Sequence, residues 1–306
     1  MQKTTSLVDQ FGNPISSGWK LVVAVQDGGG NIDQSSAQPL SSWNSGPRIG
    51  NLVACAHGYE LLNILTNELG LVSVDDAGLL RLGIVVTSDP HVAVMRVLGK
   101  IAEAVIVQEC NKNVFANRRW GMVARKGNRP HRALDDFKAI GTGLNSTQRS
   151  YASKYSPTNP QRDIIWIHKK NAAHELLQIV RGSNSGVSAG IQVKVSHDGF
   201  KYLYKSDVAT RRYEVPLVYF DLGNDFQRLA NQIYAERLDV AIGTDFVRGH
   251  VISPECHDLL VSYYWLVLDL VTGKMSLDSL VRDELLFDAF KKDVQEQSLG
   301  KSIIVV

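Results

Sequence analysis

Four short runs rich in valine and isoleucine, each bounded by turn-forming residues, constrain the fold of this chain more than any other feature. They are RDIIWIHKK (162–170), GIQVKVS (190–196), EVPLVYFDL (214–222) and LDVAIGT (238–244). Runs of this length and composition are typical of β-strands. The stretch DFQRLANQIYAER (225–237), between the last two runs, has the residue pattern of a helix. Strands interrupted by a helix predict an α/β fold with a mixed sheet.

Helices and further short strands are expected on both sides of this region. The sequence predicts, ahead of it, a strand at 20–25, a loop at 34–50, a helix at 54–69, a strand at 80–86 and a long helix with Pro90 at its first position. The stretch 111–162 is polar, basic and rich in Gly, Pro and Ser, which indicates a long loop or an irregular insert. After Pro254 the residue pattern is mostly helical.

These expectations divide the chain into three parts. Residues 1–95 would form an N-terminal α/β segment, residues 96–250 a core that carries the basic insert 111–160, and residues 251–306 a helical C-terminal segment. The predicted fold class is therefore α/β, with a central mixed β-sheet flanked by helices.

Composition excludes several classes of protein. The chain has 306 residues, of which 44% are hydrophobic and 21% charged, so it can bury a core and is neither disordered nor collagen-like. Its three cysteines, Cys55, Cys110 and Cys256, lie far apart and form no CxxC pair, which fits a reducing compartment. The most apolar windows, 78–86 and 258–271, are short or carry charge, and no signal-peptide pattern opens the chain. We therefore expect a soluble cytoplasmic protein with no membrane partner.

The strand expected at 190–196 carries two polar residues on one face. Side chains alternate along a strand, so Gln192 and Lys194 point the same way and the aliphatic residues beside them point the other way. Asp163 opens the first strand run, and Glu103 lies in the apolar middle of the helix that begins at Pro90. These four side chains can converge on one point.

Two carboxylates, an amide and a lysine suit the cleavage of a phosphodiester bond. Hard cations such as Mg²⁺ prefer oxygen ligands and keep several waters, so a few protein ligands suffice. Such a cation neutralises charge on the phosphate and lowers the pKa of an attacking water. A lysine held beside it stabilises the negative charge of the transition state, or helps to orient and deprotonate the water.

The order Glu103, Asp163, Gln192-Val193-Lys194 resembles the PD-(D/E)xK nucleases, in the subgroup where glutamine replaces the middle acid. GIQVKVS followed by YEVPLVYFDL is similar to the central strands of restriction-endonuclease-like proteins, and LGKIAEAV (98–105) resembles their first core helix. The resemblance covers residues 96–245 and implies a restriction-endonuclease-like core.

The same resemblance implies a role for each residue of the set. Asp163 would be the main metal ligand, Gln192 a second ligand, Glu103 a supporting ligand and Lys194 the catalytic lysine, with Mg²⁺ or Mn²⁺ as the cofactor. The segment between Asp163 and Gln192 is long, and Glu175 within it is the alternative to Glu103 as the supporting acid.

Each of these residues also has a purely structural interpretation. A single QxK triplet is often the solvated edge of a sheet. Asp163 alone is a turn residue that begins a strand, and Glu103 alone belongs on the polar rim of an amphipathic helix. The ordered combination favours the functional interpretation.

A basic stretch, RRWGMVARKGNRPHR (118–132), contains no acidic residue. Its cations are Arg118, Arg119, Arg125, Lys126, Arg129 and Arg132. Phosphate backbones attract such segments through charge, so these residues are candidates for binding nucleic acid. The alternative is a solvated connector.

The sequence thus predicts a Mg²⁺-dependent DNA endonuclease, in restriction or in defence against foreign DNA. The alternative is a non-catalytic nucleic-acid-binding or interaction subunit that keeps the nuclease fold. DNA is the expected partner and RNA stays open. Cleavage of both strands favours a homodimer or a partner subunit.

Overall fold

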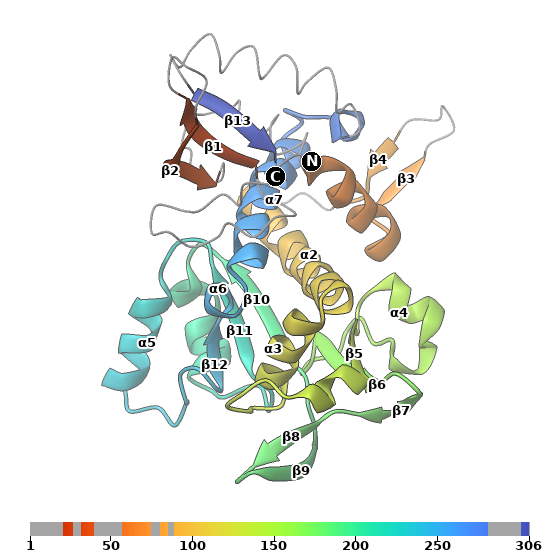
Figure 1. Cartoon of the computed structure of the whole chain (residues 1–306), viewed down its shortest axis with the longest axis vertical. Helices are drawn as coiled ribbons and strands as arrows, with labels where there is room; N and C mark the ends of the chain where they lie inside the picture. Colours follow the sequence, from red (N-terminus) through yellow and green to blue (C-terminus); the bar gives the residue numbers. More distant parts are fainter. Residues whose placement is uncertain are drawn as a thin grey trace. The chain divides into compact units, whose positions relative to one another are not determined.

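The structure is a computed structural model, and it describes residues 21–26, 32–39, 57–74, 80–84, 89–280 and 301–305 (Figure 1). The chain forms two compact units. Unit 1 comprises residues 1–63, 72–90 and 261–306, and unit 2 comprises residues 64–71 and 91–260. The predicted core, 96–250, falls within unit 2. The three-part division of the chain stays a prediction.

Unit 1 contains two small antiparallel sheets. Strand β1 (Leu21–Gln26) lies between β2 (Ile32–Pro39) and β13 (Lys301–Val305), and β3 (Val72–Val74) pairs with β4 (Leu80–Leu82). The strand predicted at 20–25 is confirmed, whereas β2 falls where a loop was predicted. Helix α7 (Pro254–Val271) begins in unit 2 and continues into unit 1, and a short 3₁₀ turn, η6 (Leu277–Leu280), follows it. The strand β13 lies in a segment predicted as helical.

The helix predicted at 54–69 is observed where the structure describes it. Residues 57–63 are helical, and η2 (Ile64–Glu68) continues as a π-helical turn. A Cβ on Gly58 would come within 2.7 Å of the backbone oxygen of Leu280, so the helix approaches η6 closely at a glycine. Among the described residues, no helix combines the length and the apolar character needed to cross a bilayer.

Unit 2 begins with α2 (Pro90–Lys112), the long helix predicted from Pro90. Its buried apolar positions include Val94, Leu98 and Ile101, which recur at helical spacing and form one packed face. Glu103 is also buried, in spite of its charge.

The strands of unit 2 form antiparallel and parallel groups. Strand β5 (Phe137–Gly141) pairs antiparallel with β6 (Ile164–His168), which pairs with β7 (Asn171–Glu175). Strands β10 (Gln192–Ser196), β11 (Leu217–Asp221) and β12 (Phe246–Arg248) are parallel, in that order. A β-bridge between Ile164 and Ile191 links the two groups at the start of β6 and β10. The mixed α/β fold predicted from the sequence is confirmed.

Helices cover both faces of the parallel strands. Tyr219 packs with Leu203 of the π-helix η5 (Phe200–Val208) and with Leu229 of α5 (Phe226–Ala235). Phe220 points the opposite way, and its ring lies 6.4 Å from that of Trp120 in α3 (Val114–Ala124). The alternation of side chains along β11 therefore separates two helical layers.

The stretch 111–160, predicted as a loop or irregular insert, is instead largely regular. After the end of α2 it contains α3, η3 (Arg132–Asp136), β5, α4 (Asn145–Ser150) and η4 (Ala152–Lys154). Trp120 is fully buried, and the Asn117 amide donates to the backbone oxygens of Leu134 and Phe137. These tertiary contacts stabilise segments whose polar composition alone favours a loop.

Two further differences concern strands. The strand predicted at 238–244 is wrong, because Gly243 adopts a φ of +87° and Asp245 accepts a hydrogen bond from the Ala241 N–H, which makes a turn before β12. The segment after β7 forms a hairpin of β8 (Leu177–Val180) and β9 (Ser183–Ser188), which was not predicted. Its turn places Arg181 and Gly182 at positive φ, as a two-residue hairpin turn requires.

Candidate functional site

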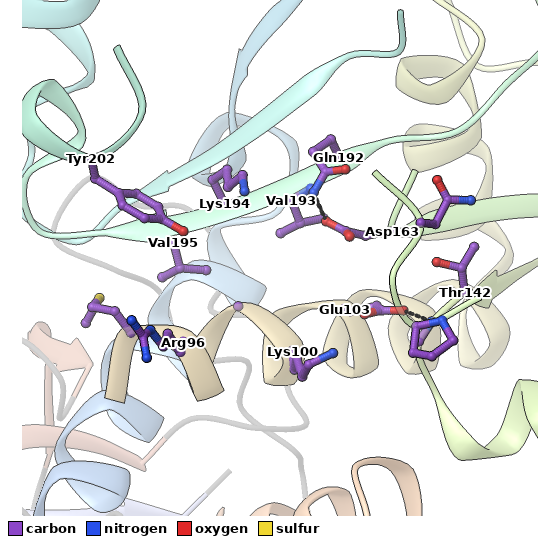
Figure 2. Close-up of a pocket in the computed structure, with 15 residues that line it drawn as sticks. Arg96, Lys100, Glu103, Thr142, Asp163, Gln192, Val193, Lys194, Val195 and Tyr202 are labelled. Carbon is purple, nitrogen blue, oxygen red and sulfur yellow. Dashed lines mark hydrogen bonds between the residues drawn. The ribbon is translucent and has the colours of Figure 1, made fainter. Parts of the chain in front are cut away.

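Glu103, Asp163, Gln192 and Lys194 line one cavity of about 210 Å³ in unit 2 (Figure 2). They come from α2, the start of β6 and strand β10. Glu103 and Asp163 thus lie beside Gln192 and Lys194, although Asp163 is 29 positions before Gln192 in the sequence. The roles assigned to them stay predictions.

The cavity lies beside the edge of β10 that faces β6. The backbone N–H of Gln192 donates to the Pro216 oxygen on the side of β11. Because successive N–H groups of a strand point to opposite edges, the N–H of Val193 points toward β6. It donates there to Asp163 Oδ2 over 2.8 Å. The bridge between Ile164 and Ile191 fixes this edge next to Asp163.

Asp163 is held by strand β10. Besides the bond from Val193, its Oδ2 accepts a hydrogen bond of 2.6 Å from the Gln192 side-chain nitrogen. Burial raises the pKa of Asp163 above its usual value, although the bond from Val193 and the charge of Lys194 act in the opposite direction. A nearby cation would favour the charged carboxylate.

Glu103 faces the same cavity from α2. Its side chain accepts a hydrogen bond of 2.9 Å from the Gly143 N–H. Burial, followed by the charge of Asp163, raises the pKa of Glu103 to about 8. Two buried carboxyl groups that disfavour each other's charge form an environment in which a divalent cation would be stabilised.

The loop after β5 needs glycine to approach Glu103 so closely. A Cβ on Gly141 would lie 2.6 Å from Glu103 Oε1, and a Cβ on Gly143 would lie 3.3 Å from Oε2. The first of these distances is a clash. Gly141 therefore permits the contact between this loop and the buried carboxylate.

The environment of the Gln192 amide oxygen indicates whether a cation fits this site. This Oε1 is buried and has no hydrogen-bond partner among the residues that the structure describes. A buried polar atom without a partner carries a desolvation cost. Together with the carboxylates of Asp163 and Glu103 it makes a set of oxygen donors, which is what Mg²⁺ or Mn²⁺ prefers. These three residues therefore fit the predicted cation.

Lys194 lies among aromatic rings. Its Nζ is 5.8 Å from the ring centroids of both Tyr202 and Tyr213. Burial lowers the pKa of Lys194, but Tyr202, Tyr213 and Asp207 outweigh it, so that the pKa stands above its usual value. Lys194 is therefore an ammonium at neutral pH. That state suits stabilisation of negative charge and does not suit the abstraction of a proton.

One face of α2 adds residues that the sequence analysis missed. Arg96, Gly99 and Lys100 line the cavity along with Glu103, at the spacing i, i+3, i+4 and i+7 of one helical face. Arg96 and Lys100 are exposed, and a Cβ on Gly99 would meet no atom of the described residues within 4 Å. The helical period counted back from Glu103 was the signal that could have identified them.

Glu175, the alternative supporting acid, has other partners. It lies on β7 and forms ion pairs of 2.6 Å with Lys154 and with Arg162. Although burial acts to raise the pKa of Glu175, the hydrogen bonds from Lys154 and Arg162 leave it below its usual value. It is not among the residues that line the cavity. The carboxyl group beside Asp163 is that of Glu103.

The basic stretch 118–132 is largely engaged in contacts within the chain. Arg118 pairs with Asp135, Arg119 with Glu109 and Lys126 with Asp245, and Arg125 donates a hydrogen bond to Asn184. Arg129 and Arg132 are exposed. None of the six lines the cavity. The first four thus have a structural role, and nucleic-acid binding by the stretch stays a prediction.

Comparisons of the chain with protein-family models, with curated proteins and with solved structures find no match.

Proposed function

We propose that this protein is a divalent-metal-dependent nuclease of the PD-(D/E)xK superfamily that hydrolyses phosphodiester bonds in DNA. The observation that carries the proposal is the cavity in which two carboxyl groups, a lysine and an amide oxygen meet, the last without a hydrogen-bond partner among the described residues. Structural roles account for each residue separately. They do not account for the gathering of all four groups, buried or half-buried, around one cavity.

The oxygens of Asp163, Glu103 and Gln192 would hold the cation. When bound, Mg²⁺ or Mn²⁺ neutralises charge on a phosphate and makes water more acidic. Lys194, kept charged by the tyrosines around it, stabilises the negative charge that develops on the phosphate in the transition state. Gln192 and Val193 fix the orientation of Asp163 through their hydrogen bonds.

The cations of α2 would contact the phosphates on either side of the scissile bond. Arg96 and Lys100 are exposed and lie on the same helical face as Glu103, so a nucleic-acid backbone that enters the cavity meets positive charge first. Cutting both strands of a duplex needs two such sites, so the proposal includes a dimer or a partner subunit. Restriction or defence against foreign DNA is the cellular setting that it implies.

The decisive experiment measures cleavage by the purified full chain. Duplex DNA, single-stranded DNA and RNA are each incubated with Mg²⁺, with Mn²⁺ and with a chelator. We expect metal-dependent cleavage of DNA that falls about 100-fold or more in Asp163→Asn and in Lys194→Ala, with binding retained. The matched controls are Asp136→Asn and Lys201→Ala, because both side chains are exposed and outside the cavity.

Two results would contradict the proposal. If the wild-type protein cleaves none of the three substrates with either metal, but binds DNA, it is a binding subunit. If the Asp163→Asn and Lys194→Ala proteins cleave as well as their controls do, the activity belongs to another site or to a contaminant. Cleavage of RNA alone would keep the site and change the substrate.

A further inference from the structure

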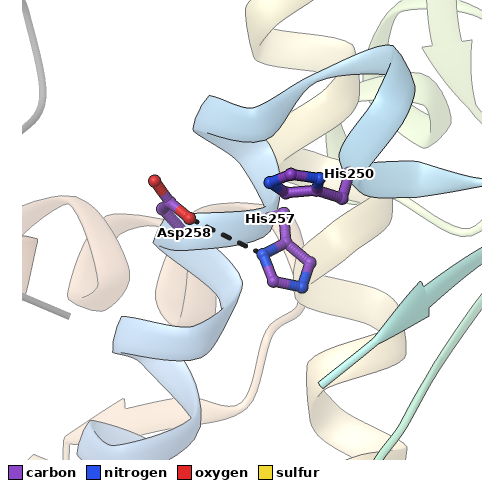
Figure 3. A group of neighbouring side chains, drawn as sticks. All are labelled: His250, His257 and Asp258. Atoms are coloured by element: carbon purple, nitrogen blue, oxygen red, sulfur yellow. Dashed lines mark ion pairs between the residues drawn. The ribbon is translucent and has the colours of Figure 1, made fainter. Parts of the chain in front are cut away.

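A second group of ligating side chains lies outside the cavity, where β12 leads into two helices (Figure 3). His250 lies on α6 (Gly249–Ile252), and His257 and Asp258 lie in the first turns of α7. One ligand atom from each lies within 4.8 Å of the other two. All three residues belong to unit 2, and none of them lines the cavity of Glu103.

His257 has an unusual environment within this group. Its side chain is only 13% exposed, and both ring nitrogens are buried without a hydrogen-bond partner among the described residues. The Asp258 carboxylate is 3.6 Å from its Nδ1, which is too far for a hydrogen bond. Because burying a polar atom without a partner is costly, such atoms usually have a ligand, a water or a special role.

The surroundings of His257 are apolar on one side and polar on the other. The Phe220 ring stacks on it at a centroid distance of 6.4 Å. The His250 ring lies edge-on to it at 4.9 Å. In Figure 3 the Nδ1 of His257 is turned toward Asp258, and the His250 ring lies beside it.

We propose that His250, His257 and Asp258 bind a divalent transition-metal ion of the zinc class. Imidazole nitrogens suit zinc, cobalt and nickel, whereas Mg²⁺ prefers oxygen ligands, so this site differs in chemistry from the cavity. Zinc bonds of about 2.0 Å require ligand atoms about 3.3 Å apart, which small rotations of the three side chains provide. Three protein ligands leave one position for water or a further ligand.

Binding there would join α6 to α7. The four residues of α6 follow β12 directly, and Ser253 separates them from α7. A metal held by both helices fixes the corner at which the chain leaves the parallel strands. The ion would stabilise the folded state, because the unfolded chain does not present the three ligands together.

The test uses the full chain, stripped of metal with a chelator and titrated with Co²⁺ and with Zn²⁺. We expect one Co²⁺ per chain with the visible absorption of a tetrahedral site, displaced by Zn²⁺, and a rise in Tm on zinc binding. His250→Ala and Asp258→Asn should lose this signal. His174→Ala is the matched control, because His174 is exposed on β7. Circular dichroism verifies that each variant is folded.

The same measurement on a cavity variant distinguishes metal binding at the histidines from metal binding in the cavity. The Asp163→Asn protein, which lacks the main cavity ligand, should bind Co²⁺ at the histidines as the wild type does. The proposal is overturned if wild-type protein shows no tetrahedral Co²⁺ absorption, or if folded His250→Ala and Asp258→Asn proteins show the same tetrahedral absorption as His174→Ala does. Neither result depends on whether the protein cleaves nucleic acid.

Discussion

The side-chain nitrogen of Gln192 donates a hydrogen bond of 2.6 Å to Asp163 Oδ2, while the buried Gln192 oxygen has no hydrogen-bond partner in the described part of the chain. One amide thus orients a carboxylate with its nitrogen and offers an oxygen ligand of its own. A glutamate at this position would offer oxygens only. The glutamine also keeps a third negative charge away from Asp163 and Glu103.

Gln192→Glu tests this relationship. The substitution removes the donor to Asp163 and adds a buried carboxyl group, so we expect Tm in chelator to fall, by roughly 2–4 °C for each kcal/mol lost. Added Mg²⁺ should recover more Tm in the variant than in the wild type, because the charge of its ligands is higher. Differential scanning calorimetry with and without Mg²⁺ measures both effects. Gln227→Glu, at an exposed position of α5, should change neither.

The raised pKa of Glu103 predicts how stability depends on pH. Since the pKa is about 8 in the folded chain and 4.5 in the reference state, the folded state favours the protonated group. The stabilisation is complete below 4.5 and is lost as pH rises through 8. Without metal, the free energy of unfolding should fall by up to about 1.4 kcal/mol for each pH unit within this window.

Glu103→Gln isolates this contribution. Its amide does not titrate, so its denaturant midpoint in chelator should be much less dependent on pH between 5 and 8 than that of the wild type. Glu214→Gln, at an exposed position, is the control and should follow the wild type. Equal pH dependence in all three proteins would show that Glu103 is not protonated in the folded state.

Two glycines near the cavity should respond in opposite ways to a methyl group. In Gly141→Ala the Cβ would overlap both Glu103 Oε1 and the Leu144 side chain, each at 2.6 Å, so we expect Tm and metal affinity to fall. In Gly99→Ala the Cβ would meet none of the atoms that the structure describes within 4 Å, and alanine is more stable than glycine inside a helix by about 0.5–1 kcal/mol. Thermal unfolding and a Mn²⁺ titration compare the two. A stable Gly141→Ala protein with normal Mn²⁺ affinity would contradict the packing around Glu103.

The position of Arg96 and Lys100 predicts their effect on nucleic-acid binding. Each phosphate contact contributes about 0.9 to the slope of log affinity against log salt concentration. Loss of both cations in Arg96→Ala/Lys100→Ala should therefore weaken binding to duplex DNA and reduce that slope by up to about 1.8. Fluorescence anisotropy at several salt concentrations measures both the affinity for duplex DNA and its salt dependence.

Arg129→Ala/Arg132→Ala is the matched pair from the basic stretch. Both residues are exposed and neither lines the cavity. If the stretch binds nucleic acid, this pair should also reduce the slope, and if it is a solvated connector the slope should stay unchanged. An unchanged slope in Arg96→Ala/Lys100→Ala would remove α2 from the binding surface.

The candidate site could be assembled from the sequence because its main residues sit in strongly patterned segments. Alternation in β10 gives Gln192 and Lys194 a common face, and the strand run after Asp163 puts that residue at the start of β6. Glu103 stands out as a charged residue in an apolar helix. Each of these patterns lies within a short segment, and each segment forms the predicted helix or strand in the folded chain.

The parts that could not be predicted depend on contacts between distant residues. The stretch 118–132 reads as basic and polar, yet Arg118 and Lys126 are paired with Asp135 and Asp245, the latter 119 positions away. No pattern within a short window contains this information.

The hairpin of β8 and β9 lies in the chain between Asp163 and Gln192, and its contacts show which part of this connection can change. Its base is closed where the Ala189 N–H donates to the Leu176 oxygen over 2.7 Å, and Ile191 is joined to Ile164 immediately beyond. The distance between Asp163 and Gln192 is therefore set by the contacts between these strands and not by the number of residues that separate the two in the chain. At the base of the hairpin, Gln178 and Ile179 bond to the backbone oxygens of Glu214 and Arg125. Its exposed tip around Arg181 and Gly182 can change in length while Asp163 and Gln192 keep their separation.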